Sequence, residues 1–119
     1  MTLSEIAQAL VDGCRAGTET ADLDRLYAAD AVSVEAQDNG NGRVAAGLDA
    51  IRAKHAWWEE NATVHAAEVE GPFPHGDDRF AVIFRMDATM FGERNQVAEV
   101  AVYTVADGRI VREEFFYAA

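Results

Sequence analysis

Residues 96–117, QVAEVAVYTVADGRIVREEFFY, alternate apolar and polar side chains on both sides of a turn signal at Asp107-Gly108. Alternation with a period of two is typical of a strand with one buried face, and Asp-Gly is typical of a hairpin turn. Strands are therefore predicted over residues 96–105 and 109–117. The same criterion predicts earlier strands over residues 64–70 and 79–90. The last three strands are expected to form an antiparallel meander.

The length of the final turn decides which side chains share a face of this hairpin. A two-residue Asp107-Gly108 turn pairs Ala106 with Arg109. A three-residue loop with a left-handed Gly108 pairs Val105 with Arg109 instead. We favour the three-residue loop because it gathers the aromatic residues on one face. The side chains then expected on the pocket side are Glu99, Tyr103, Glu113, Phe115 and Tyr117.

The first half of the chain is predicted to be mostly helical. Thr2-Leu3-Ser4-Glu5 fits a capping box, and Gly17 is the expected end of the helix that follows. A shorter helix over residues 21–29, a strand over 31–35 and a third helix over 48–61 come next. Residues 71–76, GPFPHG, are expected to interrupt regular structure. Helices followed by an antiparallel sheet make an α+β fold, in one domain over residues 1–119.

Composition restricts the function classes. The chain has 119 residues, 21 acidic against 10 basic, and a formal net charge of -11. Lys54 is the only lysine and no basic run occurs, so we expect no nucleic-acid partner. No apolar stretch is long enough to span a membrane, and a single cysteine, Cys14, makes no internal disulfide. We therefore expect a cytoplasmic protein that does not act at a membrane.

Three strings resemble a known family: YAADAVSVE at 27–35, GLDAIR at 47–52 and VYTVADGRIV at 102–111. In them the chain is similar to the nuclear-transport-factor-2-like superfamily, especially its SnoaL-like and ketosteroid-isomerase-like members. The resemblance implies a cone-shaped, cystatin-like fold, in which three helices pack on a curved sheet around a pocket. It also implies a homodimer through the outer sheet face. The apolar residues expected there are Val100, Val102, Ile110 and Phe116.

The same resemblance implies a general base at Glu35, where isomerase-like members carry an acidic residue. It also exposes two departures from those members. Their oxyanion hole uses a tyrosine on the first helix and an aspartic acid on a late strand, and these positions fall on or near Val11 and Ala101. Steroid dienolate chemistry is therefore not expected.

His55 is a candidate that the residues themselves provide. Leu48, Ile51, His55 and Trp58 recur at intervals of three and four, which places them on one helical face. An imidazole in an apolar stripe needs a partner or stays neutral. Two interpretations remain open: a cavity group, or a core histidine bonded to a backbone carbonyl.

We expect Glu35, Glu99 and Glu113 to converge near His55. Glu35 or His55 is the predicted base and Tyr103 the hydrogen-bond donor. The predicted substrate-binding residues are Trp58, Glu99, Glu113, Phe115 and Tyr117. No metal is expected, because the three histidines lie ten residues apart without a ligand motif. No cofactor is expected, because the sequence has neither a Gly-rich phosphate loop nor a dinucleotide-binding fingerprint.

Two function classes follow. The first is a cofactor-independent acid–base enzyme of isomerase, cyclase or dehydratase type, acting on a small apolar carbonyl compound. The second is a non-catalytic ligand-binding or dimerisation module of the same fold.

Overall fold

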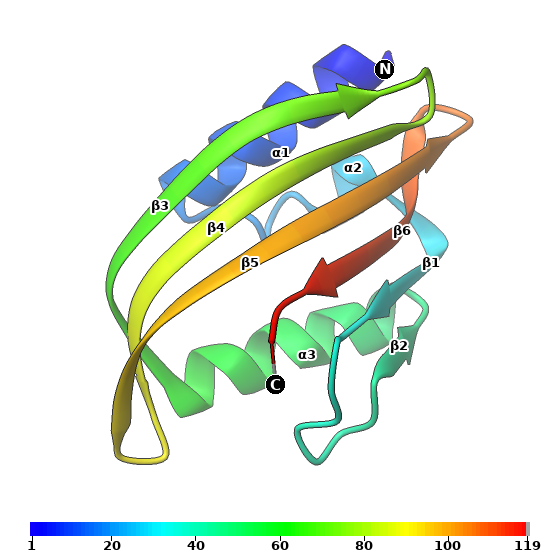
Figure 1. Cartoon of the computed structure of the whole chain (residues 1–119). Helices are drawn as coiled ribbons and strands as arrows, with labels where there is room; N and C mark the ends of the chain where they lie inside the picture. The colour runs from blue at the N-terminus through cyan, green and yellow to red at the C-terminus, as the bar shows by residue number, and fades with distance from the viewer. Residues whose placement is uncertain (119) are drawn as a thin grey trace.

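The computed structural model describes residues 1–118 of the chain. Three helices and six strands follow one another in the order shown in Figure 1. The helices are α1 (Leu3–Ala16), α2 (Leu23–Leu26) and α3 (Leu48–Asn61). The strands are β1 (Tyr27–Val34), β2 (Val44–Ala46), β3 (Ala62–His75), β4 (Arg79–Met90), β5 (Glu93–Ala106) and β6 (Arg109–Phe116).

The strands form one sheet in the order β2-β1-β6-β5-β4-β3. All neighbouring pairs are antiparallel except β1 and β6, which run parallel. The long strands β3, β4 and β5 curve around α1, while α3 lies beside β1 and β2 (Figure 1). The predicted meander of β4, β5 and β6 is therefore confirmed, within a sheet that β6 joins to β1.

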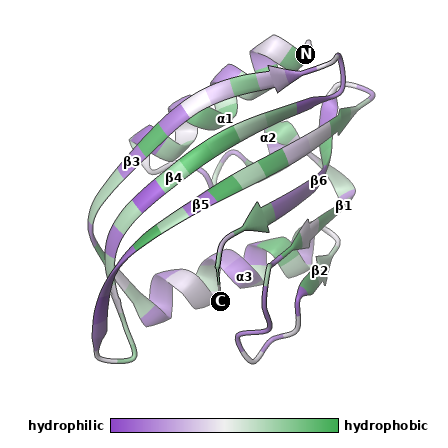
Figure 2. Ribbon diagram, viewed as in Figure 1, coloured by the Kyte–Doolittle hydropathy of each residue, from purple (hydrophilic) through white to green (hydrophobic). Residues whose placement is uncertain are grey.

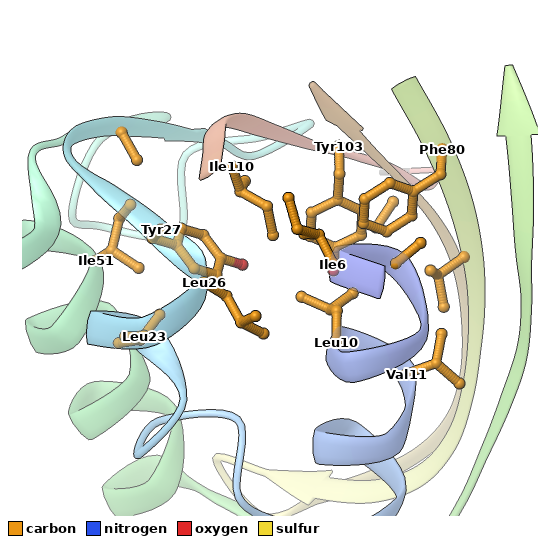
Figure 3. Packing of buried hydrophobic residues seen from close by; sticks show 14 residues of the cluster. Ile6, Leu10, Val11, Leu23, Leu26, Tyr27, Ile51, Phe80, Tyr103 and Ile110 are labelled. Atoms are coloured by element: carbon orange, nitrogen blue, oxygen red, sulfur yellow. The ribbon is translucent and has the colours of Figure 1, made fainter. Parts of the chain in front are cut away.

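The core lies between α1, α2 and the curved sheet. Ile6 of α1 lies next to Phe80 and Tyr103 of the sheet (Figure 3), and Leu10 and Val11 of α1 belong to the same buried cluster. The Phe80 and Tyr103 rings are stacked, with centroids 4.8 Å apart. In Figure 2, β5 begins with hydrophilic residues and becomes more hydrophobic toward its middle, where it covers this core.

The capping box predicted for α1 is confirmed. The Thr2 hydroxyl accepts a hydrogen bond from the Glu5 amide, and the Glu5 carboxylate accepts one from the Thr2 amide. Gly17 ends the helix in the left-handed conformation, with φ at 75°. The bounds predicted for α3, residues 48–61, are also confirmed.

The second helix is shorter than predicted, and the strand after it begins earlier. α2 ends at Leu26, and Tyr27 already pairs with Ile110 of β6. The Arg109 side chain donates hydrogen bonds to the carbonyls of Asp24 and Tyr27. These contacts come from a strand more than 80 residues away, and they end the helix where the local pattern would continue it.

The prediction that residues 71–76 interrupt regular structure is wrong, because β3 continues to His75. Its pairing with β4 shifts register between Glu70 and Phe73 and then resumes. β3 is the edge strand of the sheet, so the missing N–H of Pro72 leaves no ladder bond unmade.

The prediction of a three-residue final loop is also wrong. Ala106 pairs with Arg109, and Asp107 and Gly108 both have positive φ, as in a two-residue hairpin turn. The two-residue turn alone would place Tyr103 and Glu113 on opposite faces, but a register shift further along the hairpin reverses this. Val105 pairs with Ile110 but Thr104 pairs with Arg112, so Val111 is an extra residue. Beyond this bulge Tyr103 pairs with Glu113, and the predicted grouping on one face is restored.

The bulge also corrects the expected outer face. Ile110 points into the core and is fully buried, whereas Val100 and Phe116 are 38% and 49% exposed. The homodimer contact stays a prediction, now without Ile110. No helix among residues 1–118 is long and apolar enough to cross a membrane.

Candidate functional site

A cavity of about 360 Å³ lies between the three helices and the sheet. Apolar side chains form much of its wall, among them Leu10, Val69, Phe84 and Met86. Six of the eight predicted site residues line it: His55, Trp58, Glu99, Tyr103, Glu113 and Phe115. Glu35 and Tyr117 belong to a neighbouring polar cluster, described below.

His55 enters the cavity from α3 and is fixed by a hydrogen-bonded chain. Its Nδ1 lies 2.8 Å from the Thr20 hydroxyl, which also donates to Glu59 Oε1 at 3.2 Å. A hydroxyl has one hydrogen, and in the arrangement that places it on the Glu59 carboxylate Thr20 accepts from His55 Nδ1–H. Nε2 then carries the lone pair of the neutral ring. Burial lowers the pKa of His55 below 6.5, against the pull of Glu113, Glu19 and Glu59.

Glu113 forms a buried polar floor and is only 3% exposed. Its carboxylate accepts one hydrogen bond from the Tyr27 hydroxyl and another, 2.7 Å long, from the Ser33 hydroxyl. In Figure 3 the Tyr27 hydroxyl points from the start of β1 toward the space beside α1. Burial, followed by the Glu113 charge, raises the pKa of Tyr27 well above its ordinary value, so this hydroxyl stays a donor.

Glu99 projects from the middle of β5, opposite Phe84 of β4. Its carboxylate has no hydrogen-bond or ion-pair partner among residues 1–118. Burial raises its pKa to about 7, and repulsion from Glu35 and Glu113 adds to this while Lys54 opposes it. At neutral pH this group therefore exchanges a proton readily, a property typical of functional carboxylates.

Tyr103 lies four residues further along the same strand and faces the same cavity. It is 2% exposed, and its hydroxyl finds no partner within residues 1–118. No fully enclosed side-chain polar atom lacks a partner in that part of the chain, so this hydroxyl meets the cavity space. Burial and the Glu113 charge raise the pKa of Tyr103 well above its ordinary value. The cavity therefore contains a hydrogen-bond donor that has no protein partner among residues 1–118.

Glu35 lies directly after β1 in a cluster with Lys54 and Tyr117. One carboxylate oxygen is 2.5 Å from Lys54 Nζ, and the other accepts a 2.9 Å hydrogen bond from the Tyr117 hydroxyl. Lys54 also donates to Ser33 at 2.7 Å and lies 4.7 Å above the centre of the Phe115 ring. Through Lys54 and Ser33 the cluster connects to Glu113 of the cavity lining.

Sequence reasoning missed Thr20, Tyr27, Ser33 and Lys54. Two of them had a usable signal. Ser33 alternates with Ala31 and Glu35, and Lys54 is three residues from Ile51 and four from Trp58. Thr20 lies between two helices, where no periodicity applies. Among residues 1–118, no three His, Cys, Asp or Glu side chains are gathered so that they could hold a metal ion.

Comparison with solved structures finds close similarity. A Mesorhizobium loti protein, provisionally named a SnoaL-like polyketide cyclase, is 39% identical with a TM-score of 0.92, over 98% of this chain and 100% of that chain. A Xanthomonas campestris protein with a cystatin-like fold is 18% identical with a TM-score of 0.81, over 100% and 92% of the two chains. A Bacillus subtilis protein provisionally named an isomerase is 17% identical with a TM-score of 0.79, over 99% and 90%.

The predicted cystatin-like α+β fold is confirmed by these neighbours. No curated protein sequence matches the chain. The family model of the SnoaL-like domain matches residues 1–117. With this match and the 39% identical relative, the chain belongs to the SnoaL-like domain family.

Proposed function

We propose that the protein is a cofactor-independent acid–base enzyme in which His55 removes a proton next to the carbonyl of a small, largely apolar molecule. The observation that carries this proposal is the hydrogen-bonded chain from His55 through Thr20 to Glu59. In this proposal Thr20 donates to Glu59 and accepts from His55 Nδ1–H, so Nε2 is the free base, and the lowered pKa of His55 keeps the ring neutral near pH 7. A neutral imidazole held in one tautomer is suited to act as a general base.

Tyr103 supplies the second group that such a reaction needs. Removing a proton next to a carbonyl moves negative charge onto the carbonyl oxygen, and a donor aimed at that oxygen lowers the barrier. The Tyr103 hydroxyl is a buried donor without a protein partner. Its raised pKa means that it donates a hydrogen bond without losing its proton.

Several reaction types follow from one enolate. The imidazolium of His55 returns the proton at another carbon in an isomerisation. In an aldol-type cyclisation the enolate carbon attacks a second carbonyl of the same molecule, and the new alkoxide takes the proton. The provisional name of the Mesorhizobium loti relative supports the cyclisation class.

Deuterium uptake tests the proposal without knowledge of the natural substrate. Apolar ketones incubated with the protein in heavy water are expected to gain deuterium next to the carbonyl, as followed by proton NMR. Replacing His55 with Gln is expected to lower the rate about 100-fold or more, and Tyr103→Phe by a comparable factor. His75→Gln, an exposed histidine at the end of β3, is the matched control. Unchanged exchange in His55→Gln would refute the assignment.

A readout of the tautomer separates positioning from folding. Nitrogen NMR of the His55 ring is expected to show the proton on Nδ1 in the wild type. The Thr20→Val variant is expected to lose that preference and to lower the exchange rate, while keeping its cavity. The exchange rate is expected to rise with pH and level off above the pKa of His55, with its midpoint below 6.5.

Binding without turnover is the second candidate. It is favoured by Glu113, because both oxygens of this carboxylate already accept hydrogen bonds from Tyr27 and Ser33. A carboxylate fixed by two donors is placed to orient a ligand without taking part in proton transfer. Fluorescence of Trp58 that responds to ketones, with no deuterium uptake by any of them, would favour this candidate; Trp57→Phe leaves Trp58 as the only indole.

A further inference from the structure

The ionisable groups of the cavity wall are unevenly charged. Five carboxylates line it, from Glu19, Asp22, Glu68, Glu99 and Glu113. No lysine or arginine belongs to the lining within residues 1–118. We propose that the cavity takes an organic cation, an aromatic or otherwise apolar molecule whose ammonium group lies beside Glu99. This inference rests on the proposed function, which makes the cavity the substrate site, and it adds the chemical class of the molecule that binds there.

Glu99 is the anchor because it is the one left unpaired among the three lining carboxylates that are at least partly buried; Glu19 and Glu68 are exposed to water. Glu113 is satisfied by Tyr27 and Ser33, and Asp22 accepts from Thr18 at 2.9 Å. Glu99 has neither a donor nor a cation as partner in residues 1–118. A carboxylate removed from water is costly unless a positive charge or a donor compensates it. A ligand cation would provide that compensation.

The protein's own cations near the cavity are already engaged. The groups that face Glu99 are Glu35 after β1, Lys54 of α3 and Glu113 of β6. Of these only Lys54 is positive, and Glu35 and Ser33 hold its ammonium at 2.5 Å and 2.7 Å. Arg15, at the end of α1, donates to the backbone carbonyl of Val69 at 2.9 Å. Neither side chain reaches the Glu99 carboxylate.

Two further observations point to a ligand rather than to a cluster of surface acids. The Tyr103 hydroxyl is buried, faces the same cavity, and has no protein partner in the described chain, so it offers a donor to a ligand oxygen. The wall beside Glu99 carries aromatic rings from Trp58, Phe84 and Phe115. Aromatic faces attract cations, and the Phe115 ring already has the Lys54 ammonium above it.

The same wall disfavours anions. A phosphate or carboxylate entering the cavity would approach five carboxylates and find no lysine or arginine on the lining to pair with. The predicted selectivity is therefore cation over neutral molecule over anion. Among ligands of matched shape and apolar surface, charge alone is expected to separate the three classes.

Three matched ketones test this selectivity. Phenacyltrimethylammonium carries a fixed positive charge, neopentyl phenyl ketone has a tert-butyl group in its place, and benzoylpropionate is the anion. Binding is measured by calorimetry and by Trp58 fluorescence in the Trp57→Phe background. The ammonium ketone cannot change its own protonation, so any dependence of its affinity on pH belongs to the protein.

The ammonium ketone is expected to bind tightest. Because the cation binds the ionised form of Glu99, whose pKa is about 7, its affinity is expected to rise about tenfold from about pH 6 to about pH 8. In Glu99→Gln this rise is expected to disappear and the preference over the neutral ketone to shrink. The control Glu93→Gln removes an exposed carboxylate at the start of β5, outside the cavity lining, and is expected to keep the pH dependence.

Each other outcome is decisive. If the neutral ketone binds as tightly as the ammonium ketone, or the anion binds best, the inference is wrong; deuterium uptake by that ketone would leave the proposed function standing. If the ammonium ketone is preferred but no ketone exchanges deuterium, the inference stands and the catalytic proposal fails. Binding of none of the three overturns both.

Discussion

Replacing Glu99 with Gln is expected to change how the stability of the protein depends on pH. In the folded protein, burial raises the pKa of Glu99 from its ordinary value of 4.5 to about 7. Between these two values the folded state holds a proton that the unfolded chain has released. The free energy of unfolding therefore falls as pH rises through this range. Glutamine keeps the shape of the side chain and removes the titration.

The size of the effect follows from the two pKa values. Each pH unit between them corresponds to roughly 1.4 kcal/mol, so the wild type is expected to lose about 3 kcal/mol that Glu99→Gln keeps. Burial destabilises only the ionised carboxylate, so the loss of folding stability is fully present above about pH 7 and absent below pH 4.5. The difference in stability between variant and wild type is the quantity to measure, because other titrations cancel in it.

Urea unfolding at a series of pH values, followed by tryptophan fluorescence, provides the measurement. Glu93→Gln, at the exposed start of β5, is the matched control and is expected to show a difference that does not vary with pH. A flat difference for Glu99→Gln between about pH 4 and about pH 8 would refute the reasoning, since it would mean that burial leaves this carboxylate as acidic as in the unfolded chain.

Three other predictions concern groups around the cavity and the first helix. Glu113→Leu is expected to lower the free energy of unfolding by about 2–6 kcal/mol, because the buried hydroxyls of Tyr27 and Ser33 lose their acceptor. Glu113→Gln keeps an acceptor oxygen and is expected to lose less, so equal losses for both variants in urea unfolding would contradict this. Cys14 is expected to resist thiol reagents at about pH 8 in the native protein and to react in urea, because burial raises the pKa of its thiol to about 12. Equally fast labelling in the native and the urea-unfolded protein would contradict the burial of this thiol. Thr2→Ala is expected to cost about 1 kcal/mol in thermal or urea unfolding through loss of the cap on α1, while Thr2→Ser retains most of it.

Local chemistry was enough to predict α1 and α3. The cap of α1 and the bounds of α3 depend on residues within one or two helical turns, and both are confirmed. The alternation of Glu99 and Tyr103 on one strand likewise predicts that both face one side, and both line the cavity. In each case the deciding residues are close in the sequence.

Long-range partners were beyond the reach of these patterns. α2 ends early because Arg109 binds carbonyls at its end, and β3 passes through Pro72 because it lies at the sheet edge. The partners of the site residues show the same limit. His55 is positioned by Thr20, which is 35 residues away and lies in a connection without periodicity.

The final hairpin shows how a correct grouping can follow from an incorrect turn. The two-residue turn alone would separate Tyr103 from Glu113, and the extra residue Val111 brings them together again. Period-two patterns establish relative faces only between bulges, and bulges carry no reliable sequence signal. The structure was therefore needed to establish that Glu99 and Glu113 lie on the same wall of the cavity.

The place of β6 in the sheet has a consequence for how the chain folds during synthesis. β1 and β2 leave the ribosome before the other strands, but β1 meets the rest of the sheet only through β6, which is translated last of the six. Until then β1 and β2 share no strand pairing with β3, β4 and β5, and Glu113 has not yet met Tyr27 and Ser33. The cavity is therefore completed in a single late step, and a nascent chain lacking residues 109–116 is expected to expose two unpaired strand edges to chaperones or to aggregation.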